Sequence, residues 1–132
     1  MRLSRAAAYG VFATVHIVEK EKDSPIPGQI IAEVCSIPPG HLLKVLQQLV
    51  KSRILSSERG PSGGFSLRRP ANKITLLDIV EAIEGPIEGE LGGMNDITGK
   101  SRAKNGTKKA CDDVANYVRN HFRKTSISSL MG

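Results

Sequence analysis

The sequence has no tryptophan, three phenylalanines, two tyrosines and two cysteines among its 132 residues. With so few aromatic side chains, a packed core must be built from aliphatic residues, and a hydrophobic content of 39% is enough for one. Two cysteines cannot form a disulfide framework or a four-cysteine zinc finger, so reduced thiols are the simpler interpretation. The length is that of one domain, which argues against a two-domain enzyme.

No apolar run approaches the roughly 20 residues that a membrane-spanning helix requires. The apolar stretch 6–18 follows two arginines, but Tyr9, Thr14 and His16 interrupt it and no signal-peptide cleavage pattern follows. We therefore expect a cytoplasmic protein. Its 19 Lys and Arg against 13 Asp and Glu, a formal charge of +6, indicate a polyanion partner, with nucleic acid as the default.

Helical periodicity dominates the first part of the chain. Apolar residues at three- and four-residue spacings predict an amphipathic helix over about residues 5–20, with Ser4 as its N-cap. After a break at two prolines, a second helix of about two turns precedes a tight turn at 36–39. Pro39 is well placed as the first residue of a third helix, which runs to about Arg53.

Two alternating segments, 54–58 and 65–68, predict a β-hairpin with a glycine-rich tip between them. A fourth helix follows, at whose start Thr75 and Asp78 have the spacing of a capping box. Three helices followed by a hairpin is the order of a winged helix-turn-helix. We therefore expect a mainly α fold with a small β-hairpin, extended by a long C-terminal dimerisation helix.

The expected organisation has three parts: a winged helix-turn-helix DNA-binding domain over 1–84, a flexible loop over 85–106, and a C-terminal dimerisation helix and tail over 107–132. The loop segment carries six glycines and few apolar residues. In the last part, helical spacing returns on a narrow apolar stripe that needs another surface or subunit to cover it. The candidate dimerisation residues are Val114, Tyr117, Val118 and Phe122.

The charge gathers around the hairpin, since Lys51 to Lys73 holds six basic residues and one acidic residue. A helical projection of the third helix predicts these buried residues: Leu42, Val45, Leu46 and Leu49. It places Gly40, Lys44, Gln47 and Lys51 on the opposite face and His41, Leu43 and Gln48 on the flanks, and these seven residues are the ones expected at DNA. Glutamine amides suit an adenine edge, and lysine suits guanine or phosphate. Leu43 either contacts a thymine methyl group or has no role, and His41 meets phosphate or solvent.

Several segments together resemble the IscR/NsrR/CymR group of bacterial transcription regulators: 1–4, Tyr9, 30–33, 42–49, 74–75, 79–85 and above all Arg-Gly-Pro-Ser-Gly-Gly-Phe-Ser-Leu at 59–67. The resemblance covers about residues 1–85, and the last motif is specific. It implies a homodimeric winged-helix regulator whose C-terminal helix crosses to the partner subunit. It implies a sensor region in the loop after the fourth helix, and a wing whose Arg59 enters the minor groove. The wing residues expected at DNA are Arg59, Gly60, Pro61, Ser62 and Gly63.

The best-known members of that group carry three closely spaced cysteines in the sensor region as iron–sulfur ligands. This sequence has neither Cys nor His between Gly85 and Ala110, and one Cys111, or two in a dimer, falls short of the usual four ligands. We expect Cys35 to be a small buried residue. We therefore predict a member without cofactor or metal. Its effector stays open between a small molecule, a partner protein, a thiol event at Cys111 near the start of the last helix, and none; an inert interface thiol is the alternative for Cys111.

An enzyme would need a nucleophile with a base or a set of metal ligands, and Asp78, Glu81 and Glu84 lack a nearby histidine. The glycine-rich tip also lacks the pattern of a phosphate-binding loop. The sequence thus predicts a transcriptional repressor that is no enzyme and acts as a homodimer on a pseudo-palindromic site. The alternative is a winged-helix adaptor that binds an acidic protein partner.

Overall fold

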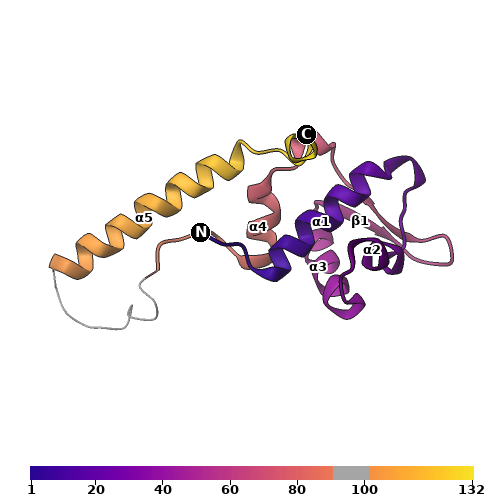
Figure 1. The fold of residues 1–132 in the computed structure, drawn as a ribbon, viewed down its shortest axis with the longest axis horizontal. Helices are drawn as coiled ribbons and strands as arrows, with labels where there is room; N and C mark the ends of the chain where they lie inside the picture. The colour runs from indigo at the N-terminus through magenta and orange to yellow at the C-terminus, as the bar shows by residue number, and fades with distance from the viewer. Residues whose placement is uncertain (91–101) are drawn as a thin grey trace.

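The computed structural model describes residues 1–90 and 102–132, and it has the expected order of helices and hairpin (Figure 1). The main elements are α1 (Arg5–Glu19), α2 (Gly28–Cys35), α3 (Pro39–Lys51), β1 (Leu55–Glu58), β2 (Gly64–Leu67), α4 (Leu76–Glu84) and α5 (Arg102–Arg123). Short 3-10 turns lie between and after them: η1 (Glu21–Asp23), η2 (Ala71–Lys73) and η4 (Ser128–Met131). Within the described residues, no helix is long and apolar enough to cross a membrane.

Local chemistry sets the ends of the first helices. The Ser4 hydroxyl accepts the Ala7 N–H at 3.0 Å, which confirms the predicted cap of α1. Pro39 occupies the first turn of α3, as expected. That helix ends at Lys51, short of the expected Arg53, because Arg53 adopts a left-handed backbone conformation, φ 62°, that turns the chain into β1.

The core is aliphatic and lies between α1, α3 and α4. The four apolar residues predicted for the inner face of α3 are each at most 3% exposed: Leu42, Val45, Leu46 and Leu49. They pack with fully buried residues from the neighbouring elements: Ile17, Ile31, Ile54, Leu55, Ile74 and Ile79. Because the inner face of α3 is fixed in this way, its polar face is held outward.

The hairpin pairs β1 with β2 in antiparallel register, with Leu55 opposite Leu67 and Glu58 opposite Gly64. The segment before α2 adds a short third edge, since the Ile26 N–H donates to the Phe65 carbonyl at 2.9 Å and the Phe65 N–H donates to the Ile26 carbonyl at 2.8 Å. A Cβ at Gly64 would collide with the backbone of Ile26. Glycine is therefore required where the wing docks on the helical body.

The start of α4 has the predicted capping box, in which the Thr75 hydroxyl accepts the Asp78 N–H at 3.0 Å and the Asp78 carboxylate accepts the Thr75 N–H at 2.9 Å. The expected start of the last helix at 107 was too late, because α5 begins at Arg102. One glycine, Gly106, costs a helix about 1 kcal/mol, which a helix of 22 residues can absorb. Of the loop expected over 85–106, residues 91–101 lie outside the described part of the chain.

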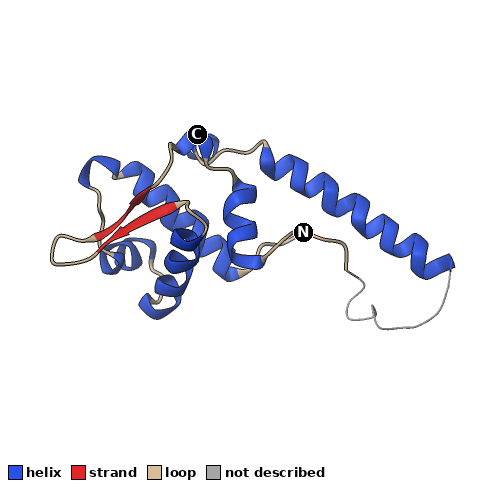
Figure 2. Cartoon of the chain, turned by 180° about the vertical axis from the view of Figure 1, so that it is seen from behind, coloured by secondary structure: helices blue, strands red, loops and turns tan. Residues whose placement is uncertain are grey.

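The tail after α5 returns to the helical body, a feature that the sequence analysis did not predict. The Leu76 N–H donates to the Thr125 carbonyl at 2.7 Å, and the Ile127 N–H donates to the Ile74 carbonyl at 2.8 Å. The side chain of Ile127 is fully buried. The C-terminal end of α5 is thus anchored, while its other end extends far from the body (Figure 2).

Candidate nucleic-acid interface

The outer face of α3 is exposed along its whole length. Every residue predicted to face DNA from this helix is exposed: Gly40, His41, Leu43, Lys44, Gln47, Gln48 and Lys51. Two lysines and two glutamine amides therefore lie on one side of a helix that is held by its buried face. This is the arrangement of hydrogen-bonding groups that a major groove can accept.

The wing tip is a tight turn that presents Arg59. The Gly63 N–H donates to the Gly60 carbonyl at 2.9 Å, and a Cβ at Gly63 would collide with the Glu58 carbonyl. Gly60 has φ 101°, a conformation that other residues rarely adopt. The predicted wing residues Arg59, Gly60, Pro61 and Ser62 are exposed, and Gly63 is half-buried beneath them.

A groove beside α3 adds residues that the sequence analysis did not place at DNA. It has a volume of about 300 Å³ and lies between the first turns of α1 and the outer face of α3, where Arg5 and Tyr9 line it with Lys44 and Gln48. Arg5 and Tyr9 are one helical turn apart, so they share a face of α1. Two features of the sequence could have pointed to them: the four-residue spacing of Arg5 and Tyr9 just after the Ser4 N-cap, and the positive charge of Arg5.

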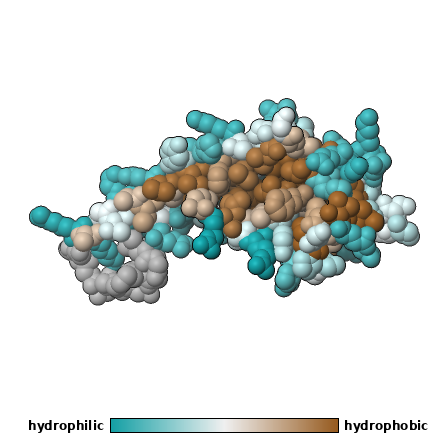
Figure 3. Space-filling view, viewed as in Figure 1, coloured by the Kyte–Doolittle hydropathy of each residue, from teal (hydrophilic) through white to brown (hydrophobic). Residues whose placement is uncertain are grey.

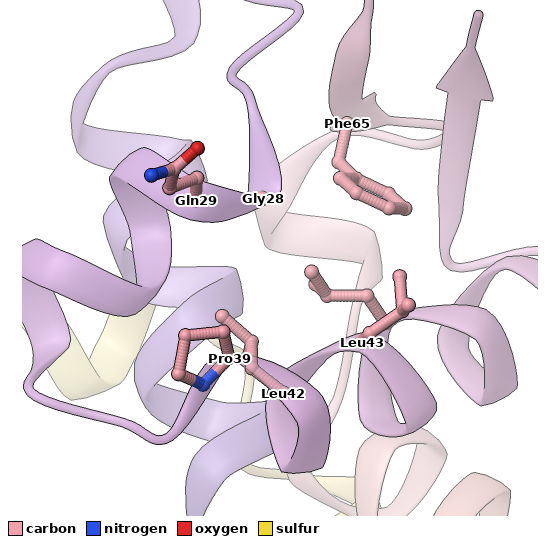
Figure 4. Close-up of a pocket in the computed structure, with 7 residues that line it drawn as sticks. Gly28, Gln29, Pro39, Leu42, Leu43 and Phe65 are labelled. Atoms are coloured by element: carbon pink, nitrogen blue, oxygen red, sulfur yellow. The ribbon is translucent and has the colours of Figure 1, made fainter.

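Leu43 lies at an apolar cleft of about 390 Å³ between α2, α3 and β2. Figure 4 shows the Phe65 ring pointing from β2 toward α3, with Gln29 on the α2 side. The side chain of Leu43 is 49% exposed at this cleft. It is therefore neither a core residue nor a fully solvated one, and an apolar group such as a thymine methyl fits its surroundings.

Not all of the basic residues counted around the wing are available to a ligand. Arg69 is engaged by the protein, since its guanidinium forms an ion pair with Asp78 at 3.2 Å. Arg68 and Lys73 are exposed. The charge available around the wing is therefore smaller than the sequence count by one residue, and it lies on the five exposed residues Lys51, Arg53, Arg59, Arg68 and Lys73.

The apolar stripe of α5 is only partly covered. Val114 is 63% exposed and Tyr117 is 74% exposed, while Val118 and Phe122 are half-buried. Ala115 is the one residue that the described helix buries. Figure 3 shows apolar surface along α5 that continues over the body of the molecule.

Cys111 lies in the middle of α5, so the expectation that it sits near the helix start is wrong. The effect of the helix dipole is confined to the first turn, and α5 begins at Arg102. The nearby positive charges are also paired, because Lys108 bonds to Asp112 at 3.1 Å and Lys109 bonds to Asp113 at 2.9 Å. Cys111 is half-buried where Gly89 packs against the α5 backbone.

Cys35 is half-buried at the end of α2, not fully buried as expected. Its thiol lies 3.9 Å from the Phe12 carbonyl. Burial, and secondarily the charge of Glu19, raise the pKa of the Cys35 thiol. This disfavours the thiolate form that reacts with oxidants and binds metals.

With this geometry in view, comparison with known proteins decides the family. The Rrf2 family, described as iron-dependent transcriptional regulators, matches residues 3–132. The chain belongs to the Rrf2 family. This confirms both the resemblance inferred from the wing motif and the winged helix-turn-helix fold with a C-terminal helix.

Relatives within the Rrf2 family span most of the chain. BadM of Rhodopseudomonas palustris is 30% identical over 131 residues, which cover 99% of this chain and 81% of BadM. The HTH-type transcriptional regulator IscR of Photobacterium profundum is 26% identical over 99% of this chain and 76% of its own length. Among solved structures, CymR, the global cysteine regulator of B. subtilis, shares the fold with a TM-score of 0.77 at 22% identity, covering 98% of this chain and 95% of CymR.

The Rrf2 description raises the question of iron, and the residues present do not fit an iron site. Cys35 lies on α2 and Cys111 on α5, and no third cysteine exists in the sequence. Among residues 1–90 and 102–132, no three His, Cys, Asp or Glu side chains gather as metal ligands would. Iron–sulfur clusters are usually held by four side chains, most often thiolates. The chain therefore departs from the ligand chemistry that the description suggests.

Proposed function

We propose that this chain is a sequence-specific DNA-binding regulator that acts as a homodimer on a pseudo-palindromic site and represses transcription without an iron–sulfur cluster. The observation that carries the proposal is the exposed polar face of α3 beside a wing that presents Arg59. The Rrf2 membership supports the same class of function.

The two surfaces suit the two grooves of a duplex. The face of α3 bearing Lys44, Gln47 and Gln48 has the width of one helix, and the major groove, about 12 Å wide, admits a helix. Arg59 extends from a narrow glycine-rich turn, and an arginine suits the negative potential of a narrow A·T-rich minor groove. Arg5 in the neighbouring groove adds a cation for the phosphate backbone.

The dimer is supported by α5. One α3 and one wing read only a half-site, and a protein with twofold symmetry reads two. Val114 and Tyr117 expose apolar surface on a helix whose free end extends from the body, where a second copy can cover it. Repression then needs no further surface, because a dimer bound at a promoter excludes polymerase by occupancy.

The absence of a cluster is supported by the sequence in the segment before α5, where Gly85 to Ala110 contains neither Cys nor His. The two thiols present lie on separate helices, and the pKa of Cys35 is raised. An effector that acts without iron, such as a small molecule or a protein, agrees with these residues.

Selection and sequencing of genomic DNA fragments bound by the purified protein tests the proposal. We expect one enriched motif with inverted half-sites and binding that weakens steeply with salt. Failure to enrich any motif would contradict a sequence-specific regulator. Salt-insensitive binding to an acidic protein, without competition by duplex DNA, would instead support the adaptor.

A further inference from the structure

We propose that Arg69 is a positioning residue of the DNA-binding surface, which fixes the wing against α3 through Asp78 and does not itself contact DNA. Its affinity test rests on the proposed DNA binding. A second test, on the distance between wing and α3, depends on the fold alone.

The guanidinium of Arg69 bonds to three separate parts of the chain. Its Nε–H donates to the Arg53 carbonyl at 3.4 Å, and Nη1 donates to the Lys73 carbonyl at 3.3 Å. Nη1 also donates to Asp78 Oδ2 at 3.2 Å, which makes an ion pair. One side chain thus joins the end of α3, the η2 turn and the first turn of α4.

The bond to Arg53 meets the backbone at a sensitive point. Arg53 has φ 62°, in the left-handed region that is unfavourable for a residue with a Cβ. At this residue the chain leaves α3 for β1, so its conformation sets the direction in which the wing departs. A donor on the Arg53 carbonyl stabilises that conformation.

The acceptor of the ion pair, Asp78, is itself held in place by α4. Asp78 Oδ2 holds the Arg69 guanidinium and the Thr75 N–H together, within the capping box of α4. The residue after Asp78 in α4, Ile79, is fully buried in the core. The base of the wing therefore cannot shift relative to α4 without breaking the ion pair.

The two adjacent arginines after β2 have different roles. Among the described residues, no hydrogen bond or ion pair engages the side chain of Arg68, which is exposed and available to a phosphate. The donors of Arg69 are directed at protein acceptors, and its side chain is 34% exposed. Replacing Arg68 or Arg69 by glutamine therefore removes the same positive charge at two neighbouring positions with different expected roles.

The affinity test uses a labelled duplex that the wild-type protein has selected from a random-sequence pool, titrated over a series of salt concentrations. Asp78→Asn removes a negative charge, which by charge alone would tighten DNA binding. We expect it to weaken binding, by about fivefold, because the link to Arg69 is lost. Arg69→Gln should weaken binding to a similar extent with an unchanged slope of log affinity against log salt, because no phosphate contact is lost.

Three controls separate positioning from charge and from stability. Arg68→Gln should reduce that slope by about one, as loss of a phosphate contact does. The double variant Arg69→Gln/Asp78→Asn should bind as weakly as either single variant, since all three break one link. Thr75→Ala removes the other half of the capping box, so it should lower thermal stability and leave DNA affinity unchanged.

The distance test needs no DNA. Spin labels on Ser62→Cys and Gln47→Cys, in the full chain with Cys35 and Cys111 replaced by serine, report the distance between wing and α3 by pulsed electron resonance. We expect Arg69→Gln to broaden the distance distribution relative to the parent.

Tighter DNA binding by Asp78→Asn, or an unchanged distance distribution in Arg69→Gln, would overturn the inference. A wild-type protein that selects no duplex would contradict the proposed function instead. The distance measurement would still decide the role of Arg69 in that case.

Discussion

Arg59 is the residue on which the proposed role of the wing depends. It stands at the edge of the turn closed by Gly60 and Gly63, where its side chain is exposed. We expect Arg59→Ala to weaken binding to a selected duplex by about 1–3 kcal/mol and to reduce the preference for A·T-rich steps. Fluorescence anisotropy with A·T-rich and G·C-rich duplexes measures both effects.

Lys109→Ala is the matched control, because it removes one exposed positive charge from α5, away from the wing. It should change affinity far less than Arg59→Ala. Equal affinities of Arg59→Ala and wild type at moderate salt would remove the wing from the mechanism.

The number and placement of the two cysteines determine whether the protein can hold an iron–sulfur cluster when it is purified without oxygen. Cys35 and Cys111 lie on different helices and offer fewer thiolates than a cluster needs. We expect a colourless protein without stoichiometric iron that binds DNA as isolated. Iron analysis and visible absorbance after anaerobic purification check this, and a stoichiometric iron–sulfur spectrum would refute it.

At the level of elements, the sequence predicted what local chemistry determines. Ser4, Pro39 and the Thr75 capping box set helix ends through bonds within a few residues, and each was predicted correctly. The return of the tail to Ile74 was missed, because one buried isoleucine, Ile127, carries no periodic signal. The end of α3 was placed too late because Arg53 adopts a left-handed backbone conformation, and the start of α5 was placed too late because the helix continues through Gly106.

The candidate site also contains residues that local sequence predicts and residues that only tertiary contacts bring together. The exposed face of α3 follows from helical periodicity, so its members could be predicted before the fold was known. The bonds of Arg69 could not, since they join it to Arg53 across the hairpin and to Asp78 across the η2 turn. The groove lined by Arg5 and Tyr9 exists only because α1 packs beside α3.

The wing depends on Gly64 for its attachment to the helical body. A Cβ there would meet backbone atoms of Ile26, which cannot move as a flexible side chain would. We expect Gly64→Ala to lower the free energy of unfolding by about 1–3 kcal/mol, as overpacking does. Gly40→Ala is the control, because a Cβ there meets open space and should cost nothing in thermal denaturation. A Gly64→Ala variant as stable as wild type would contradict this packing.

The free part of α5 should hold the dimer together. Charges introduced by Val114→Glu and Val118→Glu would lie in the buried interface, so we expect a monomer that binds DNA poorly. Asn116→Glu, on the exposed opposite side of the helix, should remain dimeric. Sedimentation of the wild type, the Val114→Glu/Val118→Glu double variant and Asn116→Glu compares their oligomeric states. A dimeric double variant would contradict the proposed role of α5.

At the scale of the whole molecule, the exposed face of α3 and the apolar stripe of α5 lie in separate parts of the chain, which α4 and the tail after α5 join. The C-terminal end of α5 is fixed to Ile74 and Leu76, next to the helix whose capping box holds Arg69. A dimer formed through α5 would therefore set the spacing between two copies of α3. That spacing must match half-sites about one helical turn of DNA apart, or a multiple of it.

Sedimentation equilibrium of the protein with the selected duplex, combined with footprinting on the same DNA, tests this account most directly. We predict two chains per duplex, protection that is symmetric about the centre of an inverted repeat, and loss of tight binding on a single half-site. One chain per duplex with an asymmetric footprint would contradict it.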